Sequence, residues 1–300
     1  MSTTLAPAAV QPKKNRNFHP MKWVWGAVAL VVSVIWVFPV YWMVNSSMLS
    51  TVVLERTTPT FLPFGGSLAN FRAVFDKGTF QQALGISIVV AVVVVTACLF
   101  FAFLAALAIS RFRFRGRKTF ILVILLVQML PAEGMFIAQY RLLKGLGESV
   151  SPVIGLNSIL GLSIIYTAAV VPFTIWMLRG FVAGVPADLE EAAMVDGLTR
   201  TQAFLRITFP LLAPGLVASG VYAFLQAWNE FTVALVIMQS ESMATLPLWL
   251  RSFLTASASR QTDWGQVMAA STLVAIPVII FFVLVQGRMT SGLVSGAVKG

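Results

Sequence analysis

The chain has 300 residues, of which 58% are hydrophobic and 11% are charged, and its formal net charge is +10. Soluble domains carry about 25% charged residues, so this composition excludes an ordinary soluble protein and indicates a membrane protein with several spans. In such a protein the excess of Lys and Arg is explained by their accumulation on the cytoplasmic side, without any need for nucleic-acid binding.

Six apolar runs are long enough to cross a bilayer, for which a helix needs about 20 residues. They cover residues 23–44, 84–109, 120–138, 159–178, 214–238 and 264–286. The first run is too long for a secretory signal and no small-residue cleavage site follows it, so we interpret it as a retained span. The sequence therefore predicts an all-α membrane protein with a tail at 1–22, a six-helix domain at 23–286 and a second tail at 287–300.

The distribution of Lys and Arg predicts the orientation. Most of these residues lie in the N-terminal tail, in RFRFRGRK at 111–118, in the segment 179–206 and in the C-terminal tail. Both termini and the segment 186–210 are therefore expected in the cytoplasm. RFRFRGRK could bind a nucleic acid, but we interpret it as a topology anchor that also contacts lipid headgroups.

The segment 190–210, EEAAMVDGLTRTQAFLRITFP, predicts two short helices separated by a glycine. Pro186 is expected to end the preceding helix, and Asp188 to cap the first short helix. Gly197 suits the end of that helix, where a positive φ favours glycine. Thr199 with Gln202 predicts a capping box for the second short helix.

The second short helix is expected to carry an apolar ridge of Ala203, Phe204 and Ile207. Pro210 and Pro214 are expected to end this helix and to begin the next span. The ridge could pack against the membrane helices of this chain, or it could enter a groove on a soluble partner.

Polar residues within the apolar runs are candidates for a solute pathway, because ionisable groups at membrane depth are costly and usually face a bundle interior. They are Glu133 in the third run and, on one expected helical face of the fifth run, Gln226, Asn229 and Glu230 with Val233. Interhelical hydrogen bonding is the alternative role for all of them.

The sequence contains none of the catalytic motifs that would indicate an enzyme. It contains no G-x-x-x-x-G-K-[ST] phosphate loop. The single cysteine, Cys98, and the single histidine, His19, lie on different segments, so neither a nucleophile–base pair nor a His/Cys metal site is expected.

The pattern Glu191-Ala192-Ala193, three residues, Gly197, nine residues, then Ile207 and Pro210 resembles the EAA motif of ABC-importer permease subunits. The family usually has Leu at the position of Phe209. RGFVAGVPADLEEAAMVDG, AWNEF at 227–231 and the final SGAVKG are similar to MalG-type permeases of carbohydrate importers. The resemblance extends over nearly the whole chain from residue 23 onward.

The resemblance implies the transmembrane fold of a type I ABC importer in the bacterial plasma membrane. It implies partners as well: a homologous second permease, a cytoplasmic ATPase dimer that binds ATP and Mg, and an extracytoplasmic solute-binding protein that the loop 239–263 would contact. This chain itself would hold no cofactor or metal. The residues that would couple to the ATPase are Glu190, Glu191, Ala192, Ala193, Asp196, Gly197, Ile207 and Pro210. Gly296, Lys299 and Gly300 would make a further ATPase contact.

Two other functions remain open at this point. The chain could be a self-contained, proton-coupled secondary transporter with Glu133 or Glu230 as its proton-linked group, although no inverted repeat is evident. It could also be a permease of the same family for a non-sugar solute such as glycerol 3-phosphate.

Overall fold

The structure, a computed structural model, describes residues 20–76, 78–131, 134–255 and 262–297, and its regular elements there are all helical. These elements are α1 (Pro20–Ser47), α2 (Thr51–Leu54), α3 (Ala69–Asp76), α4 (Phe80–Arg111), α5 (Arg117–Gln128), α6 (Phe136–Ser149), η2 (Pro152–Ile154), α7 (Ile159–Gly184), α8 (Asp188–Val195), α9 (Arg200–Ala203), η3 (Phe204–Thr208), α10 (Phe209–Asn229), α11 (Thr232–Ile237), η4 (Glu241–Met243), α12 (Leu246–Thr255) and α13 (Trp264–Ala297).

The chain divides into two units, and the boundary falls inside α1. The first unit ends at Met43, and all side chains from residue 23 to residue 40 are exposed. These residues are almost all apolar, as expected for a helix that meets lipid or another membrane protein. The second unit runs from Val44 onward and contains the remaining elements.

Among the described residues, five helical segments are long and apolar enough to cross a membrane. They correspond to the first, second, fourth, fifth and sixth predicted runs. The prediction of one continuous helix over 120–138 is wrong, because α5 ends at Gln128 and α6 begins at Phe136. Pro131 explains the break, since proline cannot donate the helical hydrogen bond and disfavours helix in the residue before it. Six crossings therefore remain a prediction.

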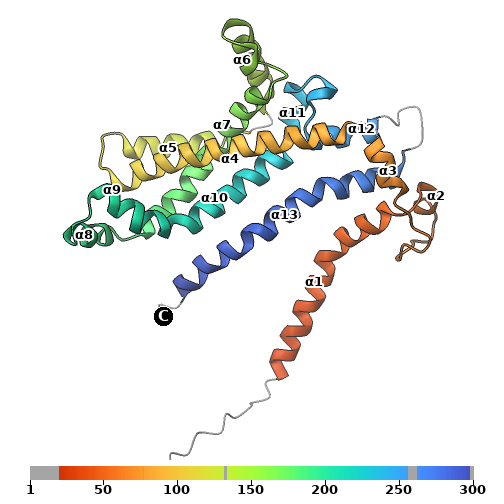
Figure 1. The fold of residues 1–300 in the computed structure, drawn as a ribbon, viewed down its shortest axis with the longest axis horizontal. Helices are drawn as coiled ribbons and strands as arrows, with labels where there is room; N and C mark the ends of the chain where they lie inside the picture. Colours follow the sequence, from red (N-terminus) through yellow and green to blue (C-terminus); the bar gives the residue numbers. More distant parts are fainter. Residues whose placement is uncertain (1–19, 77, 132–133, 256–261, 298–300) are drawn as a thin grey trace, which may run out of the picture. The chain divides into compact units, whose positions relative to one another are not determined.

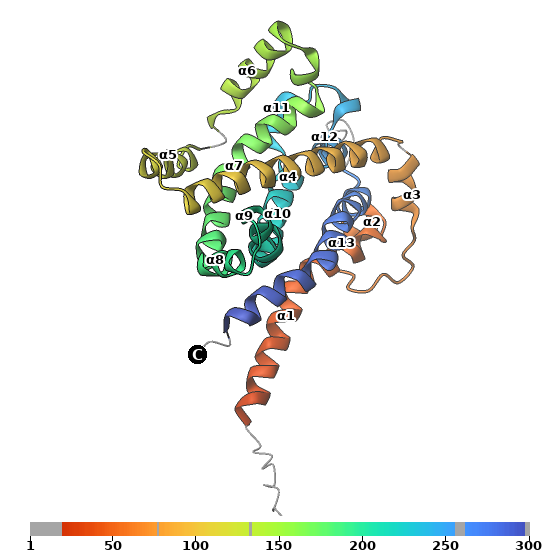
Figure 2. The same cartoon turned by 60° about the vertical axis from the view of Figure 1, so that its left-hand side comes forward.

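The centre of the second unit is formed by α4, α7 and α10, which pack against one another (Figures 1 and 2). Small residues allow this close packing. Ala102 and Ala106 of α4 are fully buried against Leu178 and Val182 of α7 and Leu212 of α10. Midway along the helices the Cys98 thiol donates to Thr174 Oγ1 over 3.2 Å. The three helices therefore form the rigid part of this unit.

Gly215 marks a close approach of α10 to α7. A Cβ atom built on Gly215 would clash with Cβ and the ring of Phe181, far inside van der Waals contact. A Cβ atom built on Gly180 of α7 would meet no such atom within 4 Å. Position 215 therefore has no room for a side chain larger than that of glycine, whereas position 180 does.

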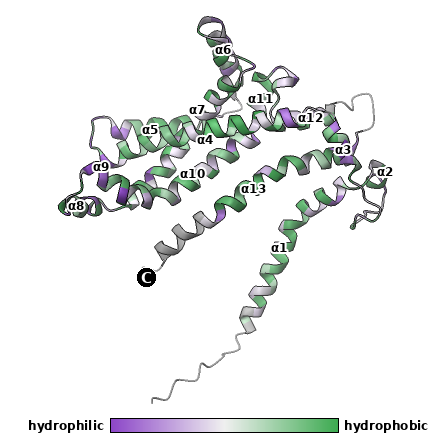
Figure 3. Ribbon diagram, in the orientation of Figure 1, coloured by the Kyte–Doolittle hydropathy of each residue, from purple (hydrophilic) through white to green (hydrophobic). Residues whose placement is uncertain are grey.

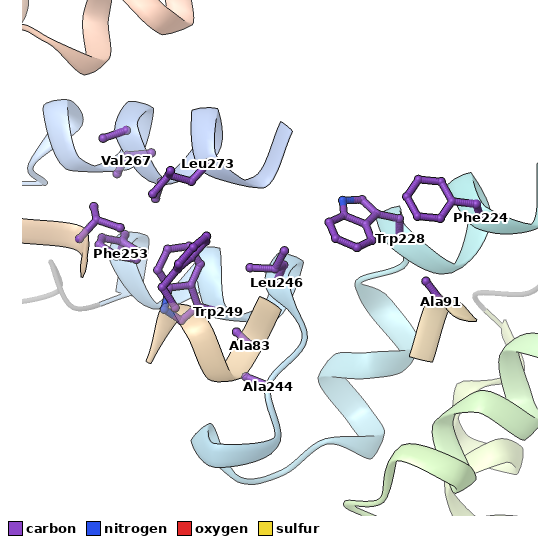
Figure 4. Packing of buried hydrophobic residues seen from close by; sticks show 14 residues of the cluster. Ala83, Ala91, Phe224, Trp228, Ala244, Leu246, Trp249, Phe253, Val267 and Leu273 are labelled. Carbon is purple, nitrogen blue, oxygen red and sulfur yellow. The ribbon is translucent and has the colours of Figure 1, made fainter. Parts of the chain in front are cut away.

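A second hydrophobic cluster includes residues of the amphipathic helix α12, which lies at the opposite end of α4 from α8 (Figure 1). Trp249 and Phe253 of α12 lie between α4 and α13, close to Ala83 and Val267 (Figure 4). The indole Nε1 of Trp249 donates to Thr79 Oγ1 over 3.0 Å, so the buried polar atom of this side chain is satisfied.

Hydropathy is distributed unevenly along the second unit. Helix α4 and the coloured part of α13 are mainly hydrophobic, whereas α8, α9 and the start of α5 gather hydrophilic residues at one end (Figure 3). By the predicted orientation, this end faces the cytoplasm.

Candidate functional site

The first short helix, α8, begins without the predicted side-chain cap. Its N-cap residue is Ala187, and Asp188 is the first helical residue, so the prediction that Asp188 caps the helix is wrong. Asp188, Glu190 and Glu191 all lie in the first turn. Carboxylates there interact favourably with the positive end of the helix dipole, which explains the acidic start without a capping hydrogen bond.

The end of α8 is built as the sequence predicts. Gly197 has φ +91°, a conformation that glycine adopts at little cost. Its N–H donates to Met194 O over 3.1 Å, and the N–H of Leu198 donates to Ala193 O over 3.1 Å. This pair of hydrogen bonds is a Schellman motif, which satisfies the last carbonyl groups and turns the chain toward α9.

The second short helix begins with the predicted capping box. The backbone N–H of Gln202 donates to Thr199 Oγ1, and the backbone N–H of Thr199 donates to Gln202 Oε1. The prediction that Pro210 and Pro214 end this helix is wrong, because helix continues from Arg200 to Asn229.

A π-turn, η3, makes this continuation possible. The N–H of Phe209 donates to Phe204 O, five residues back. Pro210 follows immediately, where its ring would clash with a carbonyl in an ordinary helix. The wider turn removes that clash, and π-turns are frequent at functional sites.

The inner side of α8 is held by a polar network that sequence reasoning missed. Glu190 Oε1 lies 3.4 Å from Arg111 Nη2, at the end of α4, and accepts a 2.7 Å hydrogen bond from Thr208 Oγ1. Arg111 Nη2 also donates to Val185 O, between α7 and α8, over 3.1 Å. The three elements α4, α8 and η3 therefore meet at one carboxylate.

The apolar ridge of the second short helix packs on this chain itself. Ala203 is fully buried. The Phe204 ring lies 6.2 Å from Phe103 of α4 and 6.4 Å from Phe209, measured between ring centroids. Ile207 is half-buried. Of the two alternatives for the ridge, the intramolecular one is therefore what the structure has.

The outer side of α8 has the opposite character. Val195 is 87% exposed, and Glu191, Ala192, Asp196 and Gly197 are exposed as well. Leu189 and Met194 add exposed apolar surface. Ala193 is buried, one helical turn from Glu190, as expected for two residues on the inner face. The predicted coupling residues are thus divided between an anchored inner face and a free outer face, and Pro210 is exposed on the following helix.

The predicted polar face of the fifth apolar run does not form. Helix α10 ends at Asn229, and Glu230 has extended backbone before α11 begins at Thr232. Glu230 accepts hydrogen bonds from the N–H groups of Val233 (2.7 Å) and Ala234 (3.0 Å). Tyr166 of α7 donates to its Oε2. The carboxylate replaces the acceptors that a continuous helix would supply, so Glu230 caps α11 instead of sharing a helical face with Val233.

The other predicted residues have different positions. Gln226 and Asn229 are exposed on α10, and Asn229 Nδ2 donates to Leu225 O over 2.9 Å. Glu133 lies outside the described residues. At the C-terminus, Gly296 falls within α13, whereas Lys299 and Gly300 lie outside the described residues.

Several long apolar helices, with a polar pair of short helices anchored at one end of α4, define a polytopic membrane protein. Residues 99–293 match the family described as "Binding-protein-dependent transport system inner membrane component". The chain belongs to this family, whose members are permease components of importers and not enzymes, and it is a multi-pass protein of the bacterial plasma membrane.

Two relatives are named as permeases of sugar transport systems. The chain is 42% identical to the diacetylchitobiose uptake system permease protein DasC of Streptomyces coelicolor, over 92% of this chain and 97% of the relative. It is 30% identical to the trehalose transport system permease protein SugB of Mycobacterium tuberculosis, with the same two coverages. These relatives support a MalG-like carbohydrate-uptake permease.

The fold is also that of a solved importer. A chain of a bacterial ABC transporter involved in the import of the acidic polysaccharide alginate superposes with a TM-score of 0.72. The superposition covers 92% of this chain and 99% of that chain at 23% identity. At this identity the likeness concerns the fold alone, and it agrees with the predicted importer fold.

Proposed function

We propose that the outer face of α8 docks into a cytoplasmic ATPase subunit and that the chain converts the movement of that subunit into opening and closing of a sugar pathway. The observation that carries this proposal is the division of α8 into two faces. Glu190 and Ala193 tie the helix to its own fold, while Glu191, Ala192 and Val195 are exposed. A helix that is anchored on one face and free on the other suits helix-in-groove recognition.

The anchoring network provides a mechanical connection. A displacement of α8 is transmitted to α4 through Arg111. It is transmitted to α10 through Thr208 and the π-turn. Hydrogen bonds to charged groups are worth roughly 1.5–3 kcal/mol, so this connection is stronger than a contact between neutral surface groups. Because α4, α7 and α10 are packed together, a displacement of α4 or α10 also displaces the other helices at the centre of the unit.

The remaining parts of the transporter follow from this assignment. In this proposal a separate ATPase dimer binds ATP and Mg; the sequence of this chain contains no G-x-x-x-x-G-K-[ST] phosphate loop. A homologous second permease completes the pore, and an extracytoplasmic binding protein delivers the solute. The solute is a sugar or oligosaccharide, which the names of the relatives support. Gln226 and Asn229 are exposed on α10 and remain candidates for the pathway.

Protection of a cysteine on α8 tests the docking. Cys98 is fully buried, so Val195→Cys provides a single accessible thiol. Val153→Cys is the matched control, because Val153 is exposed on η2, at the predicted outer side. We expect the ATPase subunit to slow maleimide labelling of Val195→Cys in the purified detergent complex and to leave Val153→Cys unchanged. Equal labelling of Val195→Cys with and without the ATPase would refute docking through this face.

A further inference from the structure

The connection between α4 and α5 gathers cations and aromatic rings on an exposed turn. We call residues 112–118, FRFRGRK, the cationic elbow. Phe112 is 59% exposed and Phe114 is 44% exposed, although aromatic side chains of this size are usually covered. Phe112 has extended backbone (φ −108°, ψ 142°), which directs Phe112 and Arg113 to opposite sides of the chain.

The positive charge of the cationic elbow is not neutralised by the residues that the structure describes. Arg113, Arg115, Arg117 and Lys118 form no ion pair with any described residue; the neighbouring Arg111 is the cation that pairs with Glu190. The sequence contains no Asp or Glu between Asp76 and Glu133. Four cations within six residues therefore lack a counter-charge nearby along the chain.

Helix stability does not explain these cations. Arg117 and Lys118 occupy the first turn of α5, which contains no acidic residue. The positive end of the helix dipole lies there and disfavours cations. Their position is unfavourable for α5 taken alone, which points to an anion outside the chain.

The surroundings of the cationic elbow identify the source of that anion. The preceding helix exposes Phe100, Phe101 and Leu104, and the following helix exposes Leu122 and Leu126. Apolar side chains exposed on both adjoining helices place the elbow at the edge of the hydrocarbon region. Clusters of Lys and Arg next to a cytoplasmic helix end attract anionic phospholipids, and aromatic rings favour the headgroup level.

We propose that the cationic elbow is a binding site for an anionic phospholipid of the cytoplasmic leaflet. The guanidinium and ammonium groups bind the lipid phosphate, and the rings of Phe112 and Phe114 lie at the boundary between headgroups and acyl chains. Arg111, the residue immediately before the elbow, holds α8 through Val185 O and Glu190. The lipid is therefore bound one residue from the anchor of α8. This contact does not depend on the docking of an ATPase.

Native mass spectrometry of the full-length chain tests the site. The chain is released from detergent micelles doped with equal amounts of phosphatidylglycerol and phosphatidylcholine, and the retained lipids are counted. The test variant is Arg113→Gln/Arg115→Gln. The matched control is Arg141→Gln/Lys144→Gln, which removes two exposed cations from α6.

We expect wild type and the α6 control to retain phosphatidylglycerol in preference to phosphatidylcholine. The elbow variant should lose that preference by on the order of tenfold, since each juxtamembrane cation contributes to attraction by an anionic surface. Arg113→Lys/Arg115→Lys, which keeps the charge, should restore most of the preference and would show that the loss is not caused by misfolding.

Three results would overturn the proposal. The elbow variant could retain phosphatidylglycerol as well as wild type does, or the α6 control could lose as much as the elbow variant. Displacement of the lipid by millimolar inorganic phosphate would show a simple anion site and not a lipid site.

Discussion

Glu190 of α8 and Arg111 of α4 are 79 positions apart in the chain, yet Glu190 Oε1 lies 3.4 Å from Arg111 Nη2. The two side chains are only 15% and 22% exposed, so solvent screens their attraction less than at an open surface. Thr208 donates a hydrogen bond to Glu190, and Arg111 donates one to Val185 O. The pair is the point at which the exposed helix α8 is joined to the packed centre of the fold.

Removal of either partner should cost stability, and removal of both should cost less than the sum. For Glu190→Ala, Arg111→Ala and the double variant we expect a coupling energy of about 1–2 kcal/mol, measured by SDS unfolding of the purified chain. Glu191→Ala is the control at an exposed position and should stay within about 0.5 kcal/mol of wild type. Strictly additive single variants would show that the two side chains do not interact.

Substitution of Gly197 should act through the backbone alone. Its φ is +91° and a Cβ there would meet nothing within 4 Å, so the cost is conformational and not steric. Gly197→Ala should cost about 1–2 kcal/mol of local helix-end stability, Gly197→Val more, and Gly197→Asn less, because Asn tolerates a positive φ. Association with the ATPase subunit, measured by co-purification, should fall in the order Asn, Ala, Val. Equal association of the Asn and Val variants would contradict this interpretation.

Glu230 and Tyr166 should contribute unequally to the stability of the chain, although their side chains are hydrogen-bonded to each other. Glu230→Ala removes the cap of α11 and leaves the Tyr166 hydroxyl without its acceptor, so we expect a loss of about 2–3 kcal/mol. Tyr166→Phe leaves both backbone hydrogen bonds of Glu230 in place and should cost about 1 kcal/mol. SDS unfolding of the two variants measures the difference, and a larger loss for Tyr166→Phe would refute the capping role.

Two glycines of the central helices, Gly215 of α10 and Gly180 of α7, should respond to alanine in opposite ways. Gly215→Ala forces a methyl group into the Phe181 ring and should cost about 1–3 kcal/mol. Gly180→Ala adds the same methyl group in open space within α7 and should be neutral or stabilising by up to about 1 kcal/mol. Thermal stability in detergent compares them directly. Similar effects of the two substitutions would show that α7 and α10 do not approach each other closely at Gly215.

Local sequence rules predicted the features of the α8–α9 segment that depend on neighbouring residues. The helix end at Gly197, which the structure closes with a Schellman motif, and the capping box of Thr199 and Gln202 each involve residues within five positions of one another. Glycine and the short polar side chains have distinct local roles, so such motifs can be recognised before the fold is known.

Features that depend on distant residues could not be predicted in this way. The inward position of Glu190 depends on Arg111, and nothing in EEAA distinguishes Glu190 from Glu191. The break at Glu230 depends on a side chain that replaces backbone acceptors and on Tyr166 of another helix. The continuation of the helix past Pro210 depends on a π-turn, which the periodicity of hydrophobic residues in the sequence does not reveal.

Solute uptake into proteoliposomes tests the central claim most directly. The chain is reconstituted alone, and also with the proposed ATPase, second permease and binding protein. Uptake of labelled diacetylchitobiose and trehalose is then followed with ATP or with a proton gradient. We predict ATP-driven uptake of a sugar by the full assembly, its loss in Glu191→Lys, and no uptake by the lone chain. Uptake by the lone chain under a proton gradient would contradict the account.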